Sequence, residues 1–210
     1  MEIAYKIFLS VHIGSGFCAL LCGIVAMIAK KGLSTHKLAG KIFSAAMLLV
    51  AFSAFALSIL KPNAFLFSIG LFALYQNYAG YRAIKNKTLV ANNLDWVMVI
   101  IALLNSVFMF YTLNIVLMVF GAINAIIAEQ QLRMFLKLRA GKVIAKNSWL
   151  KQHIGMMTGT YIATFTAFIV VNYKASWFNN ALPSWFPWLF PTLLFVPLLI
   201  YWSKKYTKKE

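Results

Sequence analysis

The sequence predicts an all-α protein, a polytopic bundle of seven transmembrane helices in a single domain over residues 1–210. Hydrophobic residues make up 62% of its 210 residues and charged residues only 11%, whereas soluble domains carry about 25% charged residues. The charged residues also gather in short segments between long apolar runs. A water-soluble fold of this length could not bury so much apolar surface, so we expect the membrane to be its solvent.

The boundaries of the spans follow from their length and from turn signals. A hydrocarbon core about 30 Å thick needs roughly 20 apolar residues per helix. Pro62 predicts a tight turn, and the apolar run from Trp96 to Glu129 is too long for one crossing, so we expect a turn at Tyr111 to Asn114. The first run ends in a lysine-rich segment rather than a small-residue cleavage site, so we expect it to remain as a membrane helix. The predicted spans are about 7–29, 42–60, 64–84, 95–112, 114–134, 150–172 and 185–203.

Lysine and arginine residues are distributed unevenly between the two sides that these spans define. Seventeen of the 20 fall on one side, and only Lys6, Lys61 and Lys174 fall on the other. Because basic residues concentrate in cytoplasmic segments, we expect the carboxyl terminus inside and the amino terminus outside. The same distribution explains the net charge of +16 without nucleic acid as a partner. It predicts contact with anionic membrane lipids at the cytoplasmic face.

Small residues spaced four apart predict where helices pack closely. Two spans, the first and the sixth, contain such rows, and we expect these two helices to be tight neighbours. The alternative is that the rows form the seam of a homodimer. The rows are Ser15, Ala19 and Gly23 in the first span, and Gly155, Gly159, Ala163 and Ala167 in the sixth.

The segment before the seventh span is rich in tryptophan and proline, a composition typical of a membrane interface. Trp177, Trp185 and Trp188 lie in it or directly after it. We expect a re-entrant or surface-lying cap, with a substrate gate as the alternative. Pro191 and Pro197 are expected to kink the last helix.

Ionisable groups within membrane spans are costly and usually have a function. His12 lies in the first span towards its outer end, His36 in the following inner loop, and His153 in the first turn of the sixth span. His36 and His153 fall on the same inner side and could face one another, whereas His12 is too distant to join them. An outer site at His12 would need another ligand, and Met109 or Met118 are the soft candidates.

Two carboxylates are expected near the same inner surface, Glu129 in the fifth span and Asp95 at the start of the fourth. With His153 they form a candidate metal set, and we expect His153 to approach Glu129 within hydrogen-bonded or water-bridged distance. Each residue also has a simpler interpretation. Asp95 could cap its helix, Glu129 could pair with Arg133 four residues later, His36 could be a solvated loop residue, and His153 could anchor its helix.

Further polar residues gather near the inner ends of the third and sixth spans. His153, Met157, Thr160 and Thr164 share one helix face by their spacing. Such a stripe lines a cavity or forms hydrogen bonds to a neighbouring helix. The predicted polar cavity comprises Gln76, Asn77, Met157, Thr160 and Tyr161.

Two stretches, residues 9–47 and 149–172, resemble a known family. Their matching features are His12, the group His36, Lys37 and Gly40, and His153 with Met157 and Tyr161. On these features the sequence resembles the bacterial membrane proteins of domain-of-unknown-function family 2306, which implies a multi-pass protein of the bacterial inner membrane. That family usually has aspartate at the inner end of the fifth span, where this chain has Glu129. A looser likeness, of architecture alone, is to diheme cytochrome b bundles.

These residues favour a membrane redox protein that binds haem b or a divalent metal at the cytoplasmic end of the bundle. His153, His36 and His12 are the candidate cofactor ligands, because imidazoles serve as axial ligands of haem iron. A proton- or ion-coupled transporter or channel, with Glu129 and His153 as relay groups, is the first alternative. A non-catalytic membrane scaffold is the second. The sequence identifies no catalytic residue and leaves open whether the protein is an enzyme.

Overall fold

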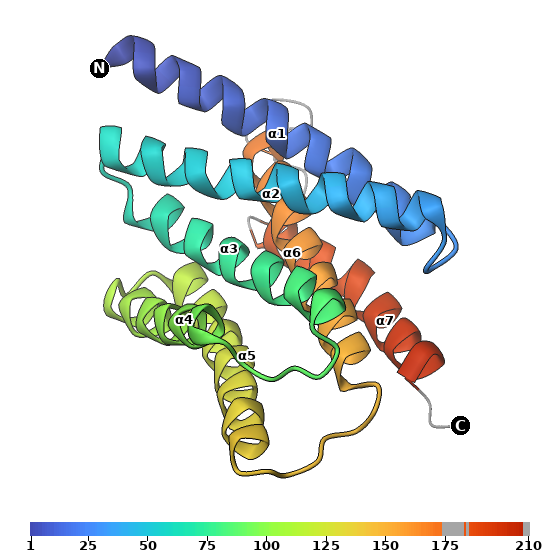
Figure 1. Ribbon diagram of the computed structural model, residues 1–210. Helices are drawn as coiled ribbons and strands as arrows, with labels where there is room; N and C mark the ends of the chain where they lie inside the picture. Colours follow the sequence, from blue (N-terminus) through green and yellow to red (C-terminus); the bar gives the residue numbers. More distant parts are fainter. Residues whose placement is uncertain (174–182, 184, 208–210) are drawn as a thin grey trace.

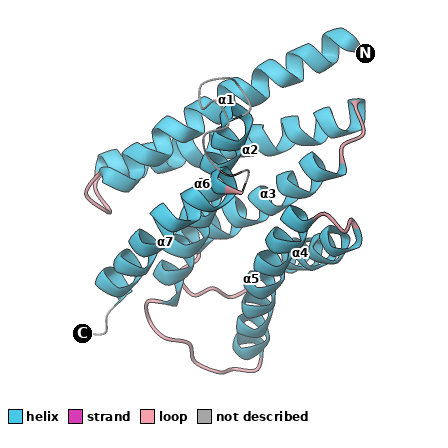
Figure 2. Cartoon of the chain, turned by 180° about the vertical axis from the view of Figure 1, so that it is seen from behind, coloured by secondary structure: helices cyan, strands magenta, loops and turns pink. Residues whose placement is uncertain are grey.

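The computed structural model describes residues 1–173, 183 and 185–207. The regular secondary structure of this part of the chain is all α-helix, as predicted. Figures 1 and 2 show a bundle of long helices joined by short connections. Six of them, all except α3, are long and apolar enough to cross a membrane, which supports a multi-pass membrane protein. The seven helices of the described residues are α1 (Glu2–Ile28), α2 (Ser34–Leu60), α3 (Ala64–Lys85), α4 (Asn93–Tyr111), α5 (Ile115–Arg139), α6 (Ser148–Tyr173) and α7 (Phe186–Thr207).

Helix α3 is less apolar because it lies at the centre of the bundle. It contacts α2, α4, α5 and α6, and it carries Gln76 and Asn77, each 1% exposed. Since neighbouring helices shield these amides, α3 can hold polar groups that a lipid-facing helix could not. Its 22 residues correspond to about 33 Å of helix, long enough to cross. Crossing by α3, and with it the count of seven spans, remains a prediction.

The two predicted turns are confirmed, and an asparagine caps the helix that follows each. After Pro62, the side chain of Asn63 accepts a hydrogen bond from the Leu66 amide at 3.0 Å. After residues 112–113, the side chain of Asn114 accepts one from the Leu117 amide at 3.1 Å. Each cap satisfies one of the free amides at a helix start, which explains why the chain resumes as a helix at that point.

Helix α2 begins at Ser34, eight residues before the predicted start of the second span. The sequence argument counted only apolar residues, but a helix can continue past the hydrocarbon while its lysines extend into water. His36 therefore lies in the first turn of a helix and not in a loop. This corrects the expected placement and gives His36 a rigid backbone.

The connections alternate between two ends of the bundle. Residues 29–33, 86–92 and 140–147 and the last turn of α7 lie at one end, which we call the basic end because it carries most of the described lysines and arginines. The amino terminus and the turns at 61–63 and 112–114 lie at the other end (Figure 1). The charge asymmetry of the sequence therefore corresponds to two ends of one structure.

The small-residue rows pack, but not in the predicted pairing. In α1 the row is buried, yet α1 packs chiefly along α2, and α6 packs chiefly on α3 and α7. Where α1 and α6 do meet, the ring of Tyr161 fills the space in front of Gly23 and keeps the two backbones apart. In α6, Gly159 faces Gln76 of α3, while Gly155 faces open space and Ala167 is exposed.

Part of the aromatic segment can be located. Trp177 and Lys174 lie outside the described residues, Trp185 is 55% exposed, and the ring of Trp188 packs edge-on against Phe65 at 6.0 Å. Pro191 and Pro197 both lie inside α7.

Candidate functional site

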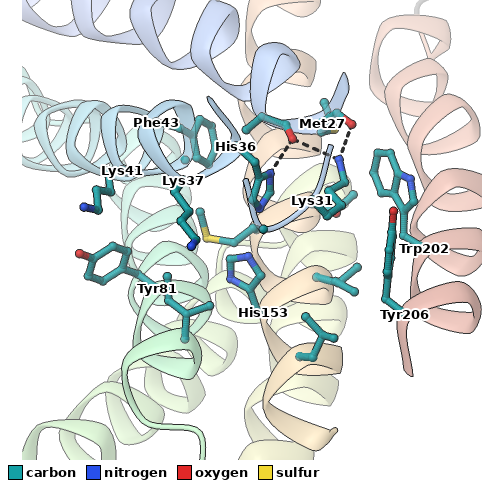
Figure 3. Close-up of a pocket in the computed structure, with 18 of the residues that line it drawn as sticks. Met27, Lys31, His36, Lys37, Lys41, Phe43, Tyr81, His153, Trp202 and Tyr206 are labelled. Atoms are coloured by element: carbon teal, nitrogen blue, oxygen red, sulfur yellow. Dashed lines mark hydrogen bonds between the residues drawn. The ribbon is translucent and has the colours of Figure 1, made fainter. Parts of the chain in front are cut away.

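A cavity of about 600 Å³ lies at the basic end. It is enclosed by the end of α1, the start of α2, the end of α3, the start of α6 and the end of α7 (Figure 3). Its wall is formed largely by apolar and aromatic side chains, among them Met27, Phe43, Ile154, Met157 and Trp202. A volume in this range suits a small organic ligand or a cofactor.

His36 is held in this cavity by the end of α1. Its Nδ1 lies 2.8 Å from the carbonyl oxygen of Ala26, one of the last carbonyls of α1, which have no partner within their own helix. A carbonyl oxygen can only accept, so Nδ1 of His36 must carry the hydrogen. In the neutral ring Nε2 then carries the free lone pair, which is the state in which an imidazole binds a metal.

His153 is held in the same way from the other side of the cavity. Its Nδ1 donates to the carbonyl oxygen of Gly80 on α3 at 2.9 Å, which again leaves Nε2 with the lone pair. Gln152 donates to the neighbouring carbonyl of Ala79 at 3.3 Å. A side chain at Gly80 would not fit, because a Cβ there would lie 2.7 Å from the sulfur of Met157. Glycine thus lets α3 and α6 approach closely enough for His153 to reach its partner.

The structure brings His36 and His153 together. Their ring centroids are 6.4 Å apart and the ring planes are nearly perpendicular, at 89°. Figure 3 shows the two imidazoles next to each other within the cavity. They are 117 residues apart in the chain, and each is oriented by a backbone carbonyl of a different helix.

Lysines surround the mouth of the cavity. Lys31 donates to the carbonyl oxygens of Ala26, at 3.1 Å, and Met27, and its ammonium lies 4.4 Å from the centre of the Trp202 ring. Burial lowers the pKa of Lys31. No carboxylate is among the described residues that line the cavity. The lining lysines are Lys31, Lys37, Lys41, Lys85 and Lys87.

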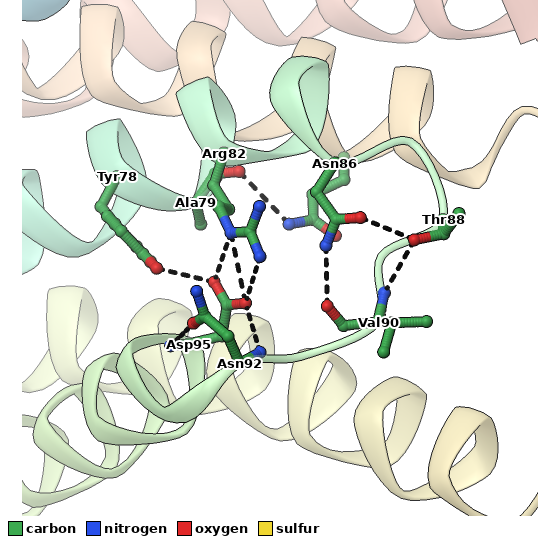
Figure 4. A network of polar contacts seen from close by, with 9 residues as sticks. Tyr78, Ala79, Arg82, Asn86, Thr88, Val90, Asn92 and Asp95 are labelled. Atoms are coloured by element: carbon green, nitrogen blue, oxygen red, sulfur yellow. Dashed lines mark hydrogen bonds and ion pairs between the residues drawn. The ribbon is translucent and has the colours of Figure 1, made fainter.

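Asp95 belongs to a separate network between α3 and α4 (Figure 4). Its carboxylate accepts from the Tyr78 hydroxyl at 2.7 Å, from the Arg82 guanidinium at 3.1 Å and from the Asn92 amide at 2.9 Å. The Asn92 side chain in turn accepts a hydrogen bond from the backbone amide of Asp95, which completes a capping box. Asp95 therefore helps to cap α4, whose N-cap residue is Asn92, and this is the simpler of the two interpretations that the sequence allowed.

Glu129 does not meet His153. It pairs with Arg133, one turn later on α5, and 42% of its side chain is exposed. Helix α5 packs on α3 and α4, and the described helices show no contact between α5 and α6. The expected approach of the two residues is therefore not formed, because α3 lies between their helices.

The predicted metal set is likewise not assembled. Asp95, Glu129 and His153 each have a different partner, and no three His, Cys, Asp or Glu side chains in residues 1–173, 183 and 185–207 lie close enough together to hold a metal ion. The structure instead places a pair of histidines where the sequence suggested a mixed set.

His12 lies away from the cavity, in the seam between α1 and α2. Its Nδ1 is 3.1 Å from the carbonyl oxygen of Val50 and 3.0 Å from the hydroxyl of Ser53. Met109 is fully buried against Phe72 in another part of the core, and in the described chain α1 contacts neither α4 nor α5. His12 is thus not joined by the methionine ligands that the sequence suggested.

The predicted polar cavity is only partly correct. Met157 and Tyr161 line the cavity, but Gln76, Asn77 and Thr160 are buried outside it. The Asn77 amide donates to the carbonyl of Ser44 in α2 at 3.0 Å, and the Thr160 hydroxyl donates to the carbonyl one turn earlier. The polar stripe of α6 therefore reaches the cavity at its first turns and is packed in the core beyond them.

Sequence reasoning missed the lysines and aromatic rings of the cavity mouth. Lys31, Lys37 and Lys87 were counted only as markers of orientation, and Trp149 and Trp202 were not considered. A signal was present, since tryptophan and lysine recur at the ends of the same predicted spans. Pairing them required knowledge of which helix ends meet.

No family model matches the chain, and no curated protein or solved structure shows a significant match to it.

Proposed function

We propose that this protein binds one b-type haem in the cavity at the basic end and takes part in one-electron transfer at the membrane. The observation that carries the proposal is the pair His36 and His153, whose Nδ1 atoms are both committed to backbone carbonyls. This hydrogen bond fixes the ring and increases the basicity of the other nitrogen, as is usual for histidines that ligate metals.

The spacing of the two rings supports the proposal that both histidines would bind one iron. Bonds from a metal to imidazole nitrogen are about 2 Å long, so two imidazoles that both bound one metal would have ring centroids at most about 6 Å apart once the ring radii are added. The observed separation is 6.4 Å. A haem brings four nitrogen ligands of its own and needs only one or two from the protein, which suits a pair of histidines.

The cavity itself suits the rest of the cofactor. Its volume is about 600 Å³, and Phe43, Ile154 and Trp202 are among the side chains of its wall, which matches the apolar face of a porphyrin. A haem bound there supplies one-electron redox chemistry, with a potential set by its ligands and by burial. The protein residues bind the iron, orient the ring and exclude water.

The proposal includes the location of the protein. We propose that α3 also crosses, giving seven spans, and that the basic end faces the cytoplasm in the bacterial inner membrane, next to anionic lipid. The charge distribution supports this placement. Reporter fusions at Lys142 and Lys174 should then report opposite sides of the membrane. Reports from the same side would contradict the seven-span topology.

The visible spectrum of the purified, full-length protein in detergent, with one equivalent of haem added, tests the proposed function. We expect the spectrum of low-spin haem with two histidine ligands. His36→Ala and His153→Ala should each abolish it and weaken haem binding at least tenfold, because a ligand bond to iron is lost. Far-ultraviolet circular dichroism should show that both variants keep their helices.

His12→Ala is the matched control, because it removes an imidazole that does not line the cavity. It should retain the low-spin spectrum. The proposal is wrong if the parent protein gives no such spectrum, or if His12→Ala loses it while His36→Ala and His153→Ala keep it.

A further inference from the structure

We infer that Lys37 and Lys41 form an anion-binding site at the edge of the cavity that α2 provides, which holds the two carboxylates of the porphyrin and so orients it with its polar edge towards these two lysines. The inference rests on the proposed function and concerns the carboxylates of the proposed ligand. It predicts that the site takes an amphiphile with an apolar body and an anionic end.

The first observation is the one-sided charge of the cavity. Five lysines line it, and no carboxylate lines it among the described residues. Elsewhere in the described chain, basic side chains do find carboxylates: Lys6 pairs with Glu2, and Arg133 with Glu129. A cationic mouth without counter-charges attracts an anion from solution or from a ligand.

The second observation distinguishes two of the five lysines. Three of the lysines lie over aromatic rings. The ammonium of Lys31 is 4.4 Å from the centre of the Trp202 ring, that of Lys85 is 5.7 Å from the Tyr81 ring, and that of Lys87 is 4.9 Å from the Trp149 ring. Lys37 and Lys41, by contrast, have no ion pair or aromatic partner in the part of the chain that the structure describes. Their ammonium groups are available to a ligand.

The third observation is their position relative to the histidines. Lys37 directly follows His36 on α2. Lys41 lies one turn beyond Lys37 on the same helix. Figure 3 shows the side chain of Lys37 extending towards His153, and that of Lys41 lying beyond it on the side of Tyr81. A ligand fixed by His36 and His153 would therefore extend its anionic groups into their reach.

The chemistry of this arrangement selects carboxylates at the edge of a flat, apolar ring. Ionised carboxylates form charge-assisted hydrogen bonds with lysine ammonium groups, and these partners remain wet at the mouth, so neither charge is stripped of water. The opposite orientation would bury both carboxylates in the apolar part of the cavity without partners, which is strongly unfavourable. The two lysines thus determine which edge of the porphyrin is buried in the cavity and which edge faces α2.

Binding titrations of the full-length protein in detergent test this inference with three probes: haem, haem dimethyl ester, which lacks the charged carboxylates, and metal-free protoporphyrin, which lacks the iron. The double variant Lys37→Gln/Lys41→Gln should bind haem and protoporphyrin about five- to tenfold more weakly, as expected for two solvent-exposed ion pairs. Its affinity for the dimethyl ester should equal that of the parent. Lys137→Gln/Lys142→Gln, which removes the same charge away from the cavity, is the control and should change none of the three.

The outcomes separate this inference from the proposed function. Equal affinity of the parent for haem and its dimethyl ester, or an equal loss in the control variant, overturns the anion site even if the two-histidine spectrum is present. Lysine-dependent binding of protoporphyrin without that spectrum supports the anion site and contradicts axial ligation. Failure of all three probes to bind overturns both.

Discussion

Two polar clusters contact the same turn of α3 and differ in the hydrogen-bonding capacity that they leave free. On one side Arg82 binds Asp95 of α4, and on the other the carbonyl of Gly80 accepts from His153 of α6. Residues two apart on a helix point about 200° away from each other, so the clusters occupy opposite faces. One joins α3 to α4, and the other joins α3 to α6 and opens into the cavity.

The difference lies in hydrogen-bonding capacity. The carboxylate of Asp95 is 3% exposed and accepts from Tyr78, Arg82 and Asn92, so it has little capacity left for a ligand. His36 and His153 each use Nδ1 in a hydrogen bond to a carbonyl, and both residues line the cavity. In the apolar surroundings of a membrane protein, a saturated polar cluster is a structural connection, and a cluster with free acceptors is a candidate binding site.

Asp95→Ala should have the largest effect and should act on stability alone. It leaves Arg82 without its carboxylate and removes the Asp95 half of the capping box of α4, and loss of one partner from a buried ion pair costs about 3–5 kcal/mol. The free energy of unfolding in mixed detergent micelles measures this loss. At temperatures where the variant is folded, its two-histidine haem spectrum should match that of the parent. A lost spectrum with unchanged stability would reverse the assignment of the two clusters.

Gly159→Leu should have an intermediate effect through the packing of α3 on α6. A Cβ at this position would overlap the side-chain oxygen of Gln76, which is buried and cannot move freely. Overpacking of this kind costs about 1–3 kcal/mol in the free energy of unfolding. Gly155→Leu is the matched control on the same helix, because no atom lies within 4 Å of a Cβ there. Equal stability of the two variants would show that Gly159 does not mark the α3–α6 contact.

Glu129→Gln should have the smallest effect. Its pair with Arg133 is exposed and lies within one helix, and surface substitutions of this kind change the free energy of unfolding by about 0.5 kcal/mol or less. Haem affinity should also be unchanged, because Glu129 lies outside the cavity. A clear loss of haem binding in this variant would restore the expected partnership of Glu129 with His153, despite the helix that separates them.

Local sequence signals predicted the elements well. Two turns were placed correctly, one by the proline at 62 and the other by the excessive length of the apolar run from Trp96 to Glu129. The alternatives for Asp95 and Glu129 that relied on residues three or four positions away also proved to be the observed contacts. What the sequence could not supply was the partner of each helix. The position of Gly80 beside His153, for example, depends on packing between segments that are 73 residues apart in the chain.

The same reasoning explains the incorrect partners. Rows of small residues in α1 and α6 indicate that each helix packs closely against something, but the row has no information on which helix that is. Here the ring of Tyr161 prevents a close approach of α1 and α6. A rule based on the spacing of small residues does not take account of a single large side chain at the contact.

The large sequence separation between His36 and His153 has a consequence for biosynthesis. The first histidine and its carbonyl partner emerge early from the ribosome, whereas the second emerges more than 100 residues later, followed by Trp202 of α7, which closes the wall. The early helices can therefore enter the membrane and pair before the cavity exists. Any ligand of this cavity must be loaded after translation of α6, so it would meet the chain as a nearly finished bundle and not as a nascent segment.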